Sequence, residues 1–71
     1  MKVGARNKLM AEVIEVKRGT VMCQVKVKLK GSDGLQMSSV MTLDSLDDMS
    51  LKVGDEVEVV VKAVNVLLMK S

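Results

Sequence analysis

The chain has 71 residues, of which 48% are hydrophobic, contains no Phe, Tyr, Trp or His, and carries a formal net charge of +2. A chain of this length forms one small domain that buries only about 60% of its unfolded surface. Its single cysteine, Cys23, excludes an internal disulfide, and the composition excludes a cysteine or histidine zinc site. Because small domains need additional stabilisation, we expect residues 1–71 to form one domain that assembles into a homo-oligomer.

The sequence also bears on the cellular compartment. The chain begins without the apolar run and small-residue cleavage site of a signal peptide. No apolar run reaches the roughly 20 residues that span a bilayer, and one unpaired cysteine suits a reducing compartment. We therefore expect a cytoplasmic protein with no membrane partner.

The first half of the chain predicts three strands. The first covers residues 9–16, where the adjacent Val13 and Ile14 predict a bulge or burial on both faces. In residues 20–30, apolar and polar residues alternate strictly, which is typical of a half-buried strand. The turn sequence GSDG at residues 31–34 then leads into a third strand over residues 35–41, so a hairpin is predicted.

The second half predicts a short helix and two more strands. Thr42 can cap a helix whose first turn contains Asp44. A tight turn at Gly54 precedes a strand over residues 57–63, and a final short strand is expected over residues 65–69. Five strands with one short helix between the third and fourth predict an all-β, OB-like Greek-key barrel.

Enzyme chemistry finds no support in this sequence. Without histidine, the usual base of a hydrolytic triad is missing. Cys23 lies on the apolar face of the most regular strand, where a buried hydrophobic role is favoured over a nucleophile. The acidic residues of the helix lack the spacing of a calcium loop. We predict a non-enzyme without a metal cofactor.

One basic stripe leaves a second function open. Lys26, Lys28 and Lys30 share one face of the second strand, as on OB-fold modules that bind single-stranded nucleic acid. Such modules normally stack bases on aromatic side chains, and this chain has none. The stripe is therefore interpreted as a solvated outer face, and we expect no nucleic-acid partner.

Two short segments could form an anion site. Gly4 and Ala5 precede Arg6 and Asn7, and Ala63 follows Lys62. Small residues let an ion approach backbone N–H groups, while arginine offers a fork of donors and lysine a movable charge. Together, these cations and backbone donors could bind a small dianion. An alternative interpretation is that Arg6 is an ordinary solvated residue near the end of the chain.

The same segments resemble the molbindin, or Mop, family of molybdate-binding domains. GARNKL at residues 4–9 is similar to the family's S-A-R-N-x-L opening, and VKRG at residues 16–19 to its V-x-K-G stretch. TLDSL at residues 42–46 is similar to I-T/S-x-x-S-V/L. LKVGDEV at residues 51–57 and VKA at residues 61–63 resemble the family's L-K-x-G-D-E-V and I-K-A. The order and spacing of these motifs carry the resemblance over almost the whole chain.

The resemblance implies a cytoplasmic protein that stores or buffers molybdate or tungstate. It implies a hexamer, built as a trimer of dimers, with oxyanion sites at subunit interfaces and no cofactor. By analogy, a first site would use Gly4, Ala5, Arg6, Asn7, Lys62 and Ala63. A second site would lie around Gly19, Thr20 and Ser45.

The chain departs from the family pattern at two positions. Gly4 stands where the family usually has serine, and Val64 lies where many members have serine or threonine. Each change removes a hydroxyl donor, and a hydrogen bond contributes about 0.5–1.5 kcal/mol, or more to a charged acceptor. A structural or regulatory domain that has lost anion binding is therefore an alternative.

Overall fold

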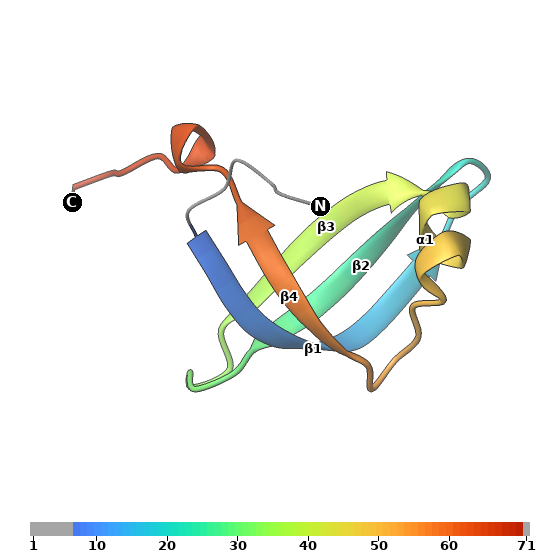
Figure 1. Cartoon of the computed structure of the whole chain (residues 1–71), viewed down its shortest axis with the longest axis horizontal. Helices are drawn as coiled ribbons and strands as arrows, with labels where there is room; N and C mark the ends of the chain where they lie inside the picture. The colour runs from blue at the N-terminus through green and yellow to red at the C-terminus, as the bar shows by residue number, and fades with distance from the viewer. Residues whose placement is uncertain (1–6, 71) are drawn as a thin grey trace.

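The structure is a computed structural model that describes residues 7–70. Its elements, in chain order, are β1 (Asn7–Arg18), β2 (Met22–Leu29), β3 (Gln36–Thr42), α1 (Leu43–Met49), β4 (Glu56–Val61) and the one-turn 3-10 helix η1 (Ala63–Asn65). The strands form one antiparallel sheet in the order β3-β2-β1-β4. This order is that of a Greek key, because the fourth strand returns to lie beside the first. Figure 1 shows that the sheet curls strongly and that α1 lies at one end of it. The predicted all-β, OB-like class with a short helix between β3 and β4 is confirmed.

The long strand β1 organises the sheet. Its first half pairs with β4, from Asn7 opposite Val61 onward, and its second half pairs with β2 as far as Arg18. The register with β2 shifts between Val13 and Glu15, so the expected bulge is confirmed. Because a bulge bends and twists its strand, β1 can turn from one neighbour to the other and curl the sheet.

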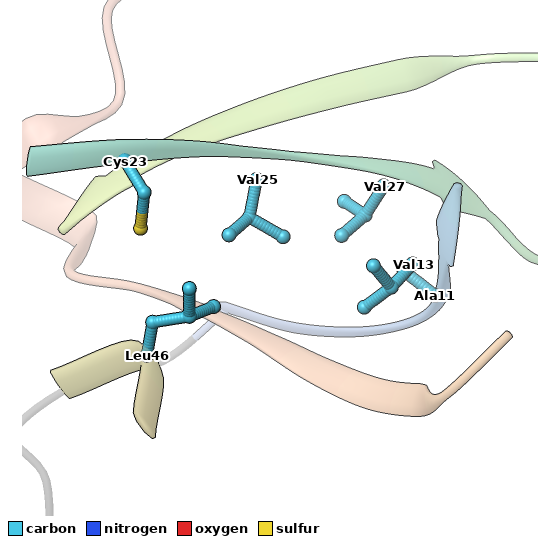
Figure 2. Packing of buried hydrophobic residues seen from close by; sticks show 6 residues of the cluster. All are labelled: Ala11, Val13, Cys23, Val25, Val27 and Leu46. Atoms are coloured by element: carbon cyan, nitrogen blue, oxygen red, sulfur yellow. The ribbon is translucent and has the colours of Figure 1, made fainter. Parts of the chain in front are cut away.

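The core lies inside the curled sheet. Figure 2 shows the six buried hydrophobic residues, which are Ala11, Val13, Cys23, Val25, Val27 and Leu46. Three of them alternate along β2, as the period-2 pattern predicts. Cys23 is 3% exposed and free, which agrees with its predicted role as a small buried hydrophobe. Leu46 closes one end of the cluster from α1.

The predicted helix forms with the expected cap. The side chain of Thr42 accepts a hydrogen bond from the backbone N–H of Ser45 over 3.1 Å. Asp44 stands in the first turn, and Leu46 is the buried residue of α1. Ser50 ends the helix in the left-handed region at φ 52°, and its N–H donates to the carbonyl oxygen of Asp47.

The prediction of a fifth strand over residues 65–69 is wrong for this structure. The described residues contain four strands, and the chain leaves the sheet after Val61 through η1. Residues 66–70 run away from the sheet (Figure 1) and have no strand partner among residues 7–70. A strand needs a neighbouring backbone to receive its hydrogen bonds, so an apolar sequence alone is insufficient here.

Candidate oxyanion site

The sheet brings the two segments of the predicted first site together. Asn7 begins β1 and lies opposite Val61, the last residue of β4. The side-chain amide of Asn7 donates to the backbone carbonyl oxygen of Val61 over 3.5 Å. Lys62 follows Val61 directly, so Asn7 and Lys62 lie at the same end of the β1–β4 ladder. Residues far apart in sequence thus converge here.

The backbone at Lys62 and Ala63 suits anion binding. Lys62 has an extended conformation, with φ −67° and ψ 136°, and precedes η1. Its carbonyl oxygen accepts a hydrogen bond from the N–H of Asn65 over 2.9 Å. The first N–H groups of a helical turn have no partner within it, and no hydrogen bond between described residues uses the N–H of Ala63. Lys62 and Ala63 are exposed residues directly after the end of β4.

The other residues of the predicted first site are Gly4, Ala5 and Arg6. They lie outside the described residues. The described part of this site therefore supplies one cationic side chain, one side-chain amide and one backbone N–H group.

The residues of the predicted second site lie around the turn between β1 and β2 and the first turn of α1. The N–H of Gly19 donates to the carbonyl oxygen of Met22 over 2.8 Å, and the N–H of Leu43 donates to that of Val21 over 2.9 Å. The turn that contains Gly19 and Thr20 is thus hydrogen-bonded to the start of α1. The Ser45 hydroxyl accepts a hydrogen bond from the Thr42 hydroxyl over 3.0 Å.

An ion pair that the sequence analysis missed joins the same two elements. The guanidinium of Arg18 lies 2.7 Å from a carboxylate oxygen of Asp47. Both side chains are more than half exposed, at 52% and 63%. The one hint of this ion pair in the sequence is that Arg18 directly precedes Gly19, a residue of the predicted second site. The two predicted sites lie at opposite ends of β1 (Figure 1), so they would bind separate ions.

The basic stripe of β2 is partly neutralised. Lys26 lies 3.7 Å from Glu15, and Lys30 lies 2.9 Å from Glu56. This arrangement agrees with a solvated outer face rather than a phosphate-binding one.

Residues 7–70 contain no group of three or more cysteine, aspartate or glutamate side chains that could hold a metal ion. No described helix is long and apolar enough to cross a membrane.

Comparison with known proteins identifies the family. Residues 4–68 match the family described as TOBE domain. The chain belongs to the TOBE domain family. It is 35% identical to molybdenum-pterin-binding protein 3 of Clostridium pasteurianum, over 97% of this chain and 98% of that protein. It is also 32% identical to a probable molybdenum-pterin-binding protein of Haemophilus influenzae, over 96% of each chain.

Solved structures of molybdate-binding proteins are similar to this chain. A molybdate-binding protein from Sporomusa ovata is 38% identical, with a TM-score of 0.89 over 99% of this chain and 100% of that one. The cytoplasmic molybdate-binding protein ModG, with molybdate bound, is 40% identical with a TM-score of 0.79. That match covers 89% of this chain and 43% of ModG. The resemblance to the Mop proteins is confirmed.

Proposed function

We propose that this chain binds molybdate reversibly and stores or buffers it in the cytoplasm, as one Mop domain over residues 1–71. Its similarity to molybdate-binding proteins along its whole length supports this function. The observation that carries it is the pairing of Asn7 with Val61, because this pairing joins the two family motifs of the first site. Binding requires no cofactor and no catalysis.

The first site would hold the dianion with charge-assisted hydrogen bonds. Arg6 and Lys62 supply positive charge, Asn7 supplies an amide, and Ala5 and Ala63 supply backbone N–H groups. Gly4 leaves room for the ion to approach the backbone. Hydrogen bonds to a charged acceptor are roughly twice as strong as neutral ones. Tungstate has the same charge and shape, so we propose that it binds as well.

The second site would use the turn between β1 and β2 and the start of α1. Gly19 and Thr20 supply backbone N–H groups there, and Ser45 supplies a hydroxyl. Arg18 adds a guanidinium to this group, although Asp47 already neutralises part of its charge.

Assembly into a hexamer, a trimer of dimers, would complete both kinds of site at subunit interfaces. The exposed position of Lys62 and Ala63 at the end of β4 supports an interface there. A ligand that binds only the assembled state stabilises it by mass action. Molybdate should therefore raise the melting temperature of the oligomer.

A domain that has lost anion binding is the second candidate. Gly4 and Val64 favour it, because each lacks a hydroxyl that the family pattern has. In this case the purified protein would be an oligomer without a response to molybdate.

The deciding experiment is calorimetric titration of the purified protein with molybdate, in the presence of excess sulfate. We expect saturable heat that survives sulfate, and we expect the share of it that belongs to the first site to be lost in Arg6→Ala and in Lys62→Ala. Lys28→Ala is the matched control, because Lys28 is an exposed lysine on the outer face of β2. If a folded oligomer releases no heat, the storage function is wrong and the second candidate, a domain that has lost anion binding, takes its place.

A further inference from the structure

An ion pair connects the two elements that would form the second site. In the guanidinium of Arg18, the last residue of β1, Nη2 lies 2.7 Å and Nη1 3.5 Å from Oδ1 of Asp47 in α1. Gly19 directly follows Arg18, and Ser45 lies in the same helix as Asp47. The ion pair therefore lies between the turn after β1 and the helix α1, which are neighbours in space (Figure 1).

The two elements are held together by other contacts as well. The N–H of Leu43, at the start of α1, donates to the carbonyl oxygen of Val21 over 2.9 Å, and Leu46 of α1 is buried in the core. The side chains of Arg18 and Asp47 are both more than half exposed. Ion pairs at such positions contribute little to stability, because water and salt screen them. Loss of this pair should therefore leave the fold intact.

The guanidinium of Arg18 has donors to spare. Both of its contacts go to one oxygen of Asp47, whereas an arginine side chain has five N–H donors. An open surface hollow of about 330 Å³ lies beside this residue, and the charged residues among those that line it are Lys17 and Arg18. Space and positive charge for a small anion are thus present next to the ion pair.

The Asp47 carboxylate and an anion at the second site would need the same cation. Arginine binds carboxylates and other oxyanions through the same planar fork of donors. A carboxylate at 2.7 Å offsets much of the attraction that the guanidinium of Arg18 exerts on a second negative group. An arriving dianion must therefore displace Asp47 or lie beside its like charge.

We propose that Asp47 competes with the anion for Arg18 and so lowers the affinity of the second site for a tetrahedral oxyanion such as molybdate. Binding at this site transfers the guanidinium from the carboxylate to the anion. The inference rests on the proposed function, which it deepens for the second site alone. It assigns Asp47 a role in setting affinity, although its negative charge prevents it from being an anion ligand.

Calorimetric titration with molybdate tests the competition in variants that already carry Lys62→Ala, which weakens the first site. Adding Asp47→Asn should raise the affinity about two- to five-fold, the range that an exposed ion pair supports. Asp48→Asn is the matched control, because Asp48 is an exposed carboxylate of the same helix without an ion pair among residues 7–70. An affinity that is unchanged or lower in Asp47→Asn, or an equal rise in Asp48→Asn, would overturn the proposal.

A double-mutant cycle shows whether the effect passes through Arg18. With Arg18→Gln also present, Asp47→Asn should give no gain in affinity, because the competition needs the guanidinium. A gain of the same size with and without Arg18 would mean that Asp47 acts by general electrostatic repulsion, and the competition would be wrong. Urea unfolding without molybdate checks that each variant remains folded.

The same titrations separate this inference from the proposed function. If the protein without substitutions binds molybdate and Asp47→Asn brings no gain, the competition fails and the proposed function stands. If the protein without substitutions gives no heat, the proposed function fails. If Asp47→Asn then gives none either, the competition fails with it.

Discussion

Asn7 and Val61 lie opposite each other at the end of the β1–β4 ladder, and the amide of Asn7 donates to the carbonyl oxygen of Val61 over 3.5 Å. This contact joins residues 54 positions apart in the chain. Arg6 precedes Asn7 in the sequence and Lys62 follows Val61. The pair therefore marks the junction at which the two cationic residues of the proposed first site belong.

The first prediction concerns the charge at this junction. Asn7→Asp adds a carboxylate beside the proposed anion and should lower the affinity for molybdate at least ten-fold, which corresponds to about 1.4 kcal/mol. Asn7→Ala should have a smaller effect, because it removes only one neutral donor. Calorimetric titration of both variants measures the difference.

A matched control separates local from general electrostatics. Gln36→Glu also adds one negative charge, but Gln36 lies opposite Lys28 at the start of β3, away from the Asn7–Val61 junction and from the turn at Gly19. We expect this variant to bind molybdate like the parent protein. Equal losses for Asn7→Asp and Gln36→Glu would rule out Asn7 as a site residue.

Local sequence patterns were sufficient to predict much of the fold. The alternation of Cys23, Val25 and Val27 fixes the buried face of β2, and Thr42 is placed by its capping chemistry. Both features depend on residues within a few positions of one another. Patterns of this kind can be read from a single sequence.

Features that depend on distant partners could not be predicted in the same way. Residues 65–69 have the composition of a strand, but a strand also requires a neighbouring strand, and they have none within the described part of the chain. The ion pair of Arg18 with Asp47 and the contact of Asn7 with Val61 likewise span 29 and 54 positions. The sequence patterns marked candidate site residues, and the register of β1 with β4 brings Asn7 and Lys62 to the same end of the sheet.

The second prediction concerns the cap of α1. The Thr42 side chain accepts the backbone N–H of Ser45 over 3.1 Å, so Thr42→Ala should lower the free energy of unfolding by about 1 kcal/mol. Thr42→Ser keeps the hydroxyl and should retain most of the stability. Urea unfolding of the two variants at equal protein concentration tests this, and equal losses for both would exclude the cap as the cause.

The third prediction concerns the end of the core that α1 closes. Leu46 is 2% exposed and belongs to the same buried cluster as Cys23 (Figure 2). Leu46→Ala should lower the free energy of unfolding by about 2–5 kcal/mol. Leu35→Ala is the control, because Leu35 is 61% exposed and its truncation leaves no cavity.

The Cys23 thiol reports on the same region. In the parent protein a thiol reagent should react with Cys23 only slowly, since the side chain is buried. In Leu46→Ala the reaction should be faster under native conditions, because local opening of the core becomes more frequent. A rate that stays unchanged in Leu46→Ala would show that α1 does not protect this part of the core.

The fourth prediction concerns the basic stripe of β2. Lys26 and Lys30 are paired with Glu15 and Glu56, so the field that this face presents to a phosphate backbone is weak. A fluorescent single-stranded oligonucleotide should show no saturable change in anisotropy when the protein is added. Glu15→Gln together with Glu56→Gln frees both lysines and should produce weak binding that disappears as salt is added. Tight, salt-sensitive binding by the parent protein, lost in Lys26→Ala with Lys30→Ala, would instead support a nucleic-acid-binding module.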